Sequence, residues 1–263
     1  MDVSYLRIAD FVIKINFFKN KEFPNSIDFF KQKMYLLQPY LLLSSQKYDF
    51  ELTLIYRNNF DTLIDKKRKK HLIGFYEEKT SNHFISYYHI SSEQLLIIVR
   101  DIIQKLLQRD KGIFVHGSAA IGKLNDKGVI FLGQSGAGKS TIINLIKSEY
   151  IAIADDIFII KEIAGKYYIY QTPFIQKNKS GNQQNERILL SSIFILKKGK
   201  EEKKVLIHDV AKIFSFISNQ SFTDLVDNVE QIKFILKLSV KVKKVYILTF
   251  SLHNREELLR VID

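Results

Sequence analysis

The sequence contains no cysteine, no tryptophan, only three prolines and no apolar run long enough to cross a bilayer. Without cysteine the chain forms no disulfide, has no thiolate nucleophile and cannot ligate zinc through sulfur. The N-terminus, Met1-Asp2-Val3-Ser4, lacks the basic-then-apolar order of a signal peptide. These absences lead us to expect a cytoplasmic protein without a membrane span.

Lysine dominates the charge of the chain. Forty Lys and Arg residues stand against 28 Asp and Glu, which gives a formal net charge of +12. Such an excess is compatible with an anionic partner, but biased codon usage also produces a Lys-, Ile-, Asn- and Phe-rich chain. The densest cluster is Lys66-Lys67-Arg68-Lys69-Lys70, and no recognised nucleic-acid-binding module accompanies it. We interpret this cluster as a solvated turn and expect no nucleic-acid partner.

The first half of the chain has the alternation and apolar runs that are typical of strands. The predicted elements are a hairpin within residues 5–18, a short helix with an irregular tail in 26–43, a strand in 48–56 and a second hairpin within 72–90. The segment Ser91-Ser92-Glu93-Gln94 resembles a capping box. It opens a helix whose apolar residues recur on one face: Leu95, Leu96, Val99, Ile102, Ile103, Leu106 and Leu107.

The second half alternates between strands and helices. The predicted strands cover residues 112–120, 128–132, 150–160, 166–170, 188–197 and 245–250, and the predicted helices cover 141–147, 210–218, 223–238 and a segment from Asn254. This pattern predicts an α/β fold with a mixed sheet flanked by helices and a β-rich N-terminal extension. We expect a boundary between residues 1–110 and 111–263, although the two regions could form one continuous domain.

A phosphate-binding loop is the strongest motif. The apolar strand Val129-Ile130-Phe131-Leu132 runs into Gly133-Gln134-Ser135-Gly136-Ala137-Gly138-Lys139-Ser140, and Thr141 and an apolar helix follow. This run fits the P-loop pattern in the strand–loop–helix context that the pattern requires. The glycines allow close backbone approach, and successive N–H groups then face a phosphate at the start of the helix. The sequence therefore predicts that Gly133, Ser135, Gly136, Ala137, Gly138, Lys139, Ser140 and Thr141 bind ATP.

Two residues of this loop have individual roles. Lys139 is expected to reach the β- and γ-phosphate oxygens, and the Ser140 hydroxyl is expected to coordinate Mg²⁺. The motif alone does not give the reaction, because P-loops serve transporters, GTPases, motors and kinases.

Asp155 and Asp156 follow the loop's helix on the next predicted strand. Adjacent strand residues point to opposite faces, so we expect the two carboxylates to have different roles. One would support the metal and the other would accept the proton of an attacking hydroxyl. His116, on the strand before the P-loop strand, is a further candidate, followed by the small residues Gly117-Ser118-Ala119-Ala120.

The polar segment 177–187 has two open interpretations. It is either a lid in which Arg187 or Lys179 neutralises charge on a transferred phosphoryl group, or a plain connection between strands.

The run from His116 to Asp156 resembles the catalytic half of HPr kinase/phosphorylase. The likeness consists of a His-Gly dipeptide on a strand, a short hairpin, G-x-S-G-x-G-K-S, a helix and a strand that ends in Ala-Asp-Asp. It implies that Lys139 and Ser140 act on phosphate and magnesium, with Asp155 as the base. It also implies Asp156 in a supporting role at the metal and His116 near the transferred phosphoryl.

Three departures separate this chain from that family. Thr141 stands where the family usually has Glu, the Glu-Ile-Arg-Gly type run is missing, and the N-terminal half does not match the regulatory domain. The layout is more similar to divergent HPr kinase-like proteins, which include serine kinases of ribosomal precursor peptides. A small protein or peptide carrying the acceptor serine is then the expected partner. HPr kinases are hexamers, so a homo-oligomer is also open.

The sequence therefore predicts an ATP- and Mg²⁺-dependent serine kinase. A small-molecule kinase, a P-loop ATPase and an ATP-binding scaffold without phosphotransfer stay open as alternatives. The Ser-Gly-Gly-Gln signature of ABC transporters is absent, and the chain offers few of the lid arginines that small-molecule kinases commonly bring.

Overall fold

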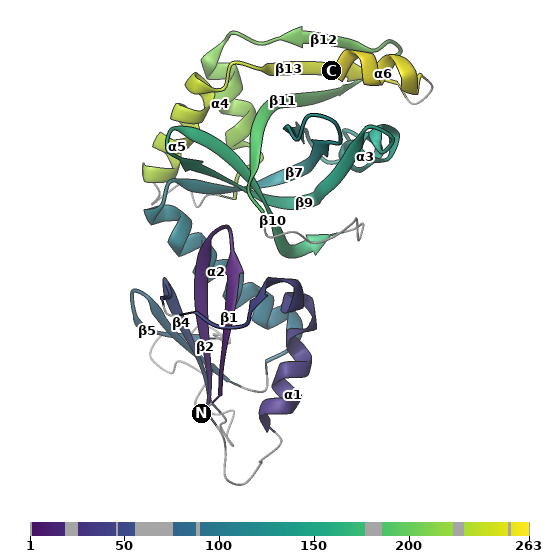
Figure 1. Cartoon of the computed structure of the whole chain (residues 1–263). Helices are drawn as coiled ribbons and strands as arrows, with labels where there is room; N and C mark the ends of the chain where they lie inside the picture. The colour runs from purple at the N-terminus through teal and green to yellow at the C-terminus, as the bar shows by residue number, and fades with distance from the viewer. Residues whose placement is uncertain are drawn as a thin grey trace, which may run out of the picture. The chain divides into compact units, whose positions relative to one another are not determined.

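The computed structural model describes residues 2–18, 26–45, 47–55, 76–87, 90–176, 186–222, 229–251 and 254–262. The chain divides into two compact units, Met1–Leu106 and Leu107–Asp263. Each unit has its own mixed sheet with flanking helices (Figure 1). The basic cluster 66–70 and most of the polar segment 177–187 lie outside the described residues.

The N-terminal unit contains a six-stranded sheet in the order β3-β1-β2-β4-β6-β5. Its elements are β1 (Asp2–Ile8), β2 (Phe11–Phe17), α1 (Ser26–Lys33), a 3-10 helix (Met34–Tyr40), β3 (Leu41–Leu42), β4 (Phe50–Ile55), β5 (Tyr76–Thr80), β6 (His83–Tyr87) and α2 (Ser92–Arg109). The antiparallel pairs β1–β2 and β5–β6 confirm the two predicted hairpins. The parallel pairing of β2 with β4 and of β4 with β6 makes this sheet mixed.

The start of α2 is fixed by a reciprocal pair of hydrogen bonds. The Ser91 backbone N–H donates to Gln94 Oε1 at 2.7 Å, and the Gln94 backbone N–H donates to Ser91 Oγ at 3.2 Å. Each side chain satisfies a backbone donor that the first helical turn would leave without a partner. The predicted capping box is confirmed.

The C-terminal unit contains a seven-stranded sheet in the order β10-β9-β7-β8-β11-β13-β12. Its strands are β7 (Gly112–Gly122), β8 (Gly128–Leu132), β9 (Tyr150–Ile163), β10 (Lys166–Gln176), β11 (Ile188–Lys198), β12 (Lys203–Leu206) and β13 (Val245–Phe250). Its helices are α3 (Lys139–Ile146), α4 (Val210–Ser218), α5 (Val229–Lys241) and α6 (Arg255–Ile262). Strands β8, β11 and β13 are parallel, whereas β7 pairs antiparallel with both β8 and β9.

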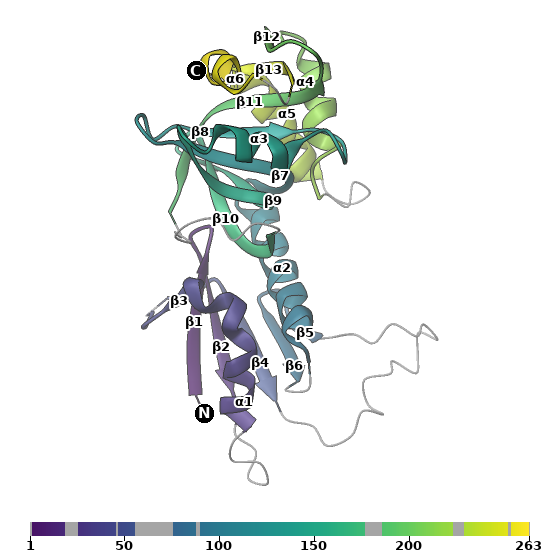
Figure 2. The same ribbon diagram turned by 90° about the vertical axis from the view of Figure 1, so that its right-hand side faces the viewer.

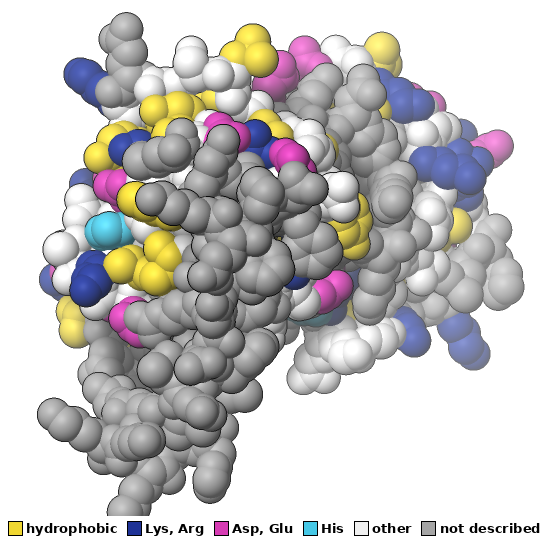
Figure 3. Space-filling model, turned by 90° about the horizontal axis from the view of Figure 1, so that it is seen from below, with side chains coloured by type: hydrophobic (Ala, Val, Ile, Leu, Met, Phe, Trp, Pro, Cys, Tyr) yellow, Lys and Arg dark blue, Asp and Glu magenta, His cyan; other side chains and the backbone are white. Residues whose placement is uncertain are grey.

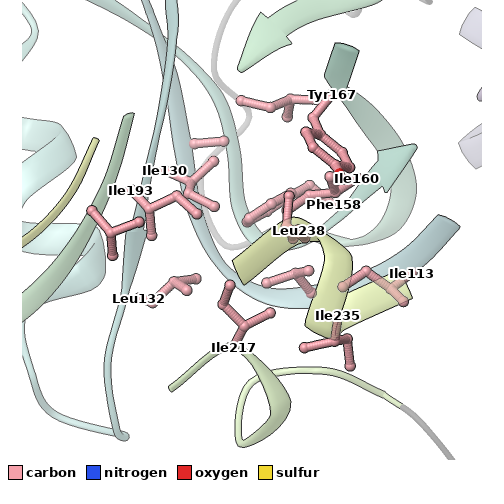
Figure 4. Packing of buried hydrophobic residues seen from close by; sticks show 14 of the residues in the cluster. Ile113, Ile130, Leu132, Phe158, Ile160, Tyr167, Ile193, Ile217, Ile235 and Leu238 are labelled. Carbon is pink, nitrogen blue, oxygen red and sulfur yellow. The ribbon is translucent and has the colours of Figure 1, made fainter. Parts of the chain in front are cut away.

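Alternating side chains bury both faces of this sheet. On β8, Ile130 and Leu132 face one apolar cluster, and Val129 and Phe131 face the other. Helices α4 and α5 cover the first face, where Ile235 and Leu238 of α5 belong to the same apolar cluster as Phe158 and Ile160 (Figure 4). Helices α3 and α6 cover the second face (Figure 2). The sheet is therefore the middle layer of three.

Strand β9 contains the predicted strand 150–160 and continues past the acidic pair to Ile163. The resemblance to HPr kinases placed Asp155 and Asp156 at the end of a strand, but they lie in the middle of β9. The strand continues because residues 157–161 pair with β7 on one side and residues 158–163 pair with β10 on the other. Pairing shifts between Ala119 and Ala120 of β7, where β9 contributes one extra residue. This bulge precedes the carboxylates, and bulges of this kind re-aim the side chains beside them.

A short additional pairing joins β10 to β11 through Tyr168–Leu189 and Ile169–Ile188. Strands β10, β9, β7, β8 and β11 thereby form a closed ring, from which β13 and β12 extend. No described helix is both long and apolar enough to cross a membrane. On the face in Figure 3, the basic side chains of the described residues are interspersed with acidic, polar and hydrophobic ones.

Candidate functional site

The loop Gly133–Ser140 connects β8 to α3, as the motif requires. Gly138 precedes the helix with φ +100°, and Gly136 has φ +79°, so both occupy a backbone region that L side chains rarely adopt. A Cβ on Gly138 would lie 2.8 Å from the ring of Phe250. Position 138 therefore needs glycine for its backbone angle and for the space.

Lys139 begins α3 and lies along the loop. Its Nζ donates to the carbonyl oxygens of Gly133 at 2.7 Å and of Gln134 at 3.3 Å. The ammonium group is thus held at the mouth of the loop, beside the N-terminal end of α3. The positive end of the helix and the ammonium group add their charge at one place, which favours an anion there.

Asp155 is buried, with 3% of its surface exposed. Ser118 of the neighbouring strand β7 faces it, and the Ser118 hydroxyl donates to Asp155 Oδ1 over 2.9 Å. A buried carboxylate needs such partners because the loss of water would otherwise be costly. The serine holds one carboxylate oxygen in place.

Asp156 has a different partner. Its Oδ1 lies 3.0 Å from His116 Nδ1, and the His116 ring meets the edge of Phe222 at 6.2 Å between centroids. The His116 backbone N–H donates to the carbonyl of Gln220 at 2.6 Å. A three-residue segment after α4 therefore lies along β7 and holds the histidine beside Asp156.

A cavity of about 650 Å³ brings the loop, the carboxylates and the histidine together. The predicted site residues that line it are His116, Ser135, Gly136, Gly138, Lys139, Ser140, Thr141, Asp155 and Asp156. Both carboxylates face this cavity, although they are adjacent on one strand. Their separate hydrogen-bond partners, Ser118 and His116, still distinguish them.

Sequence reasoning missed several residues that line the same cavity: Ser118, Lys198, Gly199, Lys200, Phe250 and Ser251. Lys198 ends β11 and Phe250 ends β13, and both strands run parallel to the P-loop strand β8. The carboxyl ends of parallel strands meet at one edge of a sheet. The strand order was the missing signal, because the predicted strands alone did not say which of them neighbour the loop.

Two predicted site residues line a different cavity, and two further candidates belong to the polar segment 177–187. Gly133 and Ala137 line a second cavity on the other side of the loop. Arg187 lies over the ring of Tyr168 at 5.4 Å and is not among the residues that line the first cavity. Lys179 lies outside the described residues.

The chemistry of the first cavity suits a hydrated divalent cation bound together with phosphate. Ser140 and Asp156 offer oxygen ligands, which Mg²⁺ prefers, and Mg²⁺ at phosphate sites commonly takes only one or two protein ligands. Among the described residues, no group of three or more His, Cys, Asp or Glu side chains is placed to hold a metal ion by itself. The lining residues therefore fit a metal that the protein and a phosphate share.

The fold and the cavity together define a mixed α/β protein with a glycine-rich, lysine-containing loop that faces two carboxylates. A family model described as "SynChlorMet cassette protein ScmC" matches residues 88–255, so the chain belongs to the ScmC family. No curated protein matches the chain.

Among solved structures, the chain is similar to the Hpr(Ser) kinase/phosphatase from Coxiella burnetii. The match covers 56% of this chain and 93% of that one, with 13% sequence identity and a TM-score of 0.30. A likeness at this level does not carry an activity over to this chain.

Proposed function

We propose that this protein is an ATP-dependent serine kinase of the HPr kinase-like type. It transfers the γ-phosphoryl group of ATP to a serine hydroxyl on a small protein or a ribosomal precursor peptide. The observation that carries the proposal is that Lys139 and Ser140 line one cavity with Asp155 and Asp156. A phosphate-binding loop and a buried carboxylate in one cavity are what phosphoryl transfer to a hydroxyl needs.

In this proposal the loop holds the donor. Its backbone N–H groups and the Lys139 ammonium bind the β- and γ-phosphates and keep the γ-phosphoryl group inside the cavity. Ser140 and Asp156 hold Mg²⁺, which supplies neutralisation of the phosphate charge when it is bound. His116 orients Asp156 from 3.0 Å and lies near the transferred group.

Asp155 acts on the acceptor. Its carboxylate orients the serine hydroxyl in line with the γ-phosphorus and accepts the hydroxyl proton as the new O–P bond forms. The bond between the γ-phosphorus and the β–γ bridging oxygen breaks in the same step, and ADP leaves. The Ser118 hydroxyl donates to Asp155 Oδ1 and holds the carboxylate at the cavity wall. Lys198 and Lys200 line the same cavity and add positive charge where the phosphoryl group moves.

Intact-mass measurement tests this function. The protein is incubated with Mg-ATP together with HPr or a peptide encoded beside its gene. An increase of about 80 Da on an acceptor marks one added phosphate. Asp155→Asn should abolish the transfer while nucleotide affinity stays nearly unchanged, because Asp155 acts on the acceptor rather than on the donor.

A further variant, Lys139→Ala, and two matched controls complete the test. Lys139→Ala should weaken nucleotide binding, whereas Lys147→Ala, exposed just after α3, should not. Asp126→Asn, in a turn outside the cavity, should leave transfer intact. An active Asp155→Asn variant would exclude this residue as the base, and ATP hydrolysis without transfer would support the ATPase alternative.

A further inference from the structure

The loop Gly133–Ser140 also borders a second cavity of about 740 Å³. This cavity lies on the α4 side of the sheet, between the loop, β11 and the C-terminal end of α4. Its walls include Ile195 and Leu196 of β11 and, from α4 and the turn after it, Phe216, Asn219 and Gln220. The described residues that line it carry no charged side chain.

The two cavities meet at the tip of the loop. Ser135 and Gly136 line both of them. The first cavity contains Lys139, both carboxylates, His116, Lys198 and Lys200. The second contains backbone, apolar surface and amide side chains. A ligand that crosses the loop tip would therefore have one charged part and one neutral part.

A nucleoside triphosphate has this composition. Its triphosphate belongs with the charged groups of the first cavity, where the acceptor hydroxyl must also approach Asp155. If the nucleoside also lay in the first cavity, it would compete with the acceptor for space there. A nucleoside bound in the neutral second cavity leaves the first cavity free for the acceptor.

The side chains of the second cavity suit a nucleobase. Phe216 is half-buried and offers an aromatic ring, against which a base can stack. Asn219 is exposed at the end of α4, and its amide has both donors and an acceptor for a base edge. Gln220 Nε2 donates to the backbone carbonyl oxygen of Asn219 at 3.2 Å. This hydrogen bond holds the Gln220 side-chain amide at the same wall of the cavity as Asn219.

We propose that the second cavity is the nucleoside subsite. The base stacks on Phe216 and is read by the amides of Asn219 and Gln220, while the triphosphate passes over Ser135 and Gly136 to Lys139. This proposal rests on the proposed function, because it concerns the donor nucleotide of the same site. It assigns base recognition to α4 and the turn that follows it.

Calorimetric titration with three probes separates the two parts of the ligand: ATP, GTP and inorganic tripolyphosphate, each with magnesium. Phe216→Ala should weaken the binding of ATP by about tenfold and leave tripolyphosphate affinity within about twofold, because stacking concerns only the base. The matched control is Phe214→Ala. Both rings pack against the same apolar cluster, but Phe214 does not line the cavity.

A second variant tests the same subsite at an exposed position, so that unfolding of Phe216→Ala does not leave the proposal without a test. Asn219→Asp exchanges an amide for a carboxylate at an exposed position and should change the ratio of ATP to GTP affinity by about threefold or more. An unchanged ratio together with an unchanged ATP affinity in Phe216→Ala would overturn the nucleoside subsite. Equal weakening of ATP and tripolyphosphate by Phe216→Ala would also overturn it.

The same titrations distinguish this failure from failure of the proposed function. Wild-type protein that binds tripolyphosphate as tightly as ATP would overturn only the subsite. Wild-type protein that binds neither probe, or a Lys139→Ala variant that binds both normally, would overturn the kinase proposal as well.

Discussion

At the scale of single residues, the two carboxylates differ in what holds them. Asp155 is buried and accepts a hydrogen bond from Ser118, whereas Asp156 pairs with His116. A hydrogen bond to a charged acceptor is stronger than one between neutral groups and fixes the carboxylate plane. In the proposed reaction Ser118 would therefore be a positioning residue that acts through Asp155.

Ser118→Ala tests this role. We expect kcat to fall by about tenfold with the KM for ATP unchanged, since a hydrogen bond to a charged group contributes about 1.5–3 kcal/mol and part of it is recovered by water. Steady-state kinetics that follow the formation of phosphorylated acceptor would measure kcat and the KM for ATP. Ser118→Thr, which keeps the hydroxyl, should restore most of the rate.

Ser192→Ala is the matched control, because Ser192 is a buried serine of the same sheet that does not line the first cavity. An equal loss of kcat in both variants would assign the effect to packing rather than to Asp155.

The site residues were predictable where they are contiguous in sequence. The loop Gly133–Ser140 and the pair Asp155-Asp156 are local patterns with a chemical meaning, and the structure brings Lys139, Ser140 and both carboxylates to one cavity. Lys198 and Phe250 were not predictable in this way. They belong to the cavity only because β11 runs beside β8 and β13 runs beside β11, which a local pattern does not record.

At the scale of elements, prediction succeeded where local hydrogen bonds or strong periodicity decide. The capping box opened α2, and the boundaries of α4 agreed with the predicted residues 210–218 because Asp209 caps its first turn. Strand β12 was missed. It is a four-residue strand on the edge of the sheet, its Val205 and Leu206 are exposed, and its hydrogen bonds with β13 hold it.

An ion cluster links strand β9 to helix α5. Glu162 Oε1 lies 2.6 Å from Lys237 Nζ and 3.7 Å from Lys241 Nζ. Burial alone would raise the pKa of Glu162, but the hydrogen bond and charge of Lys237, together with Lys241, lower that pKa below its ordinary value. Because the folded pKa is lowered, this carboxylate stabilises the fold above the unfolded pKa and ceases to do so as the pH falls through the folded value.

Glu162→Gln should therefore reduce the melting temperature by a few degrees at neutral pH, and the difference from wild type should vanish well below pH 4. Thermal unfolding of both proteins across this range measures it. The control is Glu230→Gln, which breaks an exposed pair with Lys233 on α5 and should change little. A difference that persists in acid would exclude the charge of Glu162 as its cause.

At the scale of the whole molecule, the chain has two compact units with separate sheets. All the described residues that line the two cavities at the loop belong to the C-terminal unit. A ligand that binds the folded state stabilises it by mass action, about 2.7 kcal/mol at a hundred times its Kd. The C-terminal unit should therefore be stabilised by the bound ligand, and the N-terminal unit should not.

Amide hydrogen exchange with and without Mg-ATP tests this expectation. Protection should increase in β7, β8, α3 and β9, and the strands β1, β2 and β4 of the N-terminal unit should exchange as before. The Lys139→Ala variant serves as the control that lacks the response. An equal gain in the N-terminal strands would mean that the two units share the binding energy.

The closed ring of strands has a consequence for the order in which the chain is made. Strand β8 leads into the loop Gly133–Ser140. Its parallel partner β11 comes later in the chain, after β9, β10 and the segment that joins β10 to β11. Domains begin to fold while synthesis proceeds from the N-terminus. The edge of β8 therefore lacks its parallel partner until residues 190–195 have left the ribosome, and the loop becomes fully supported only late in synthesis.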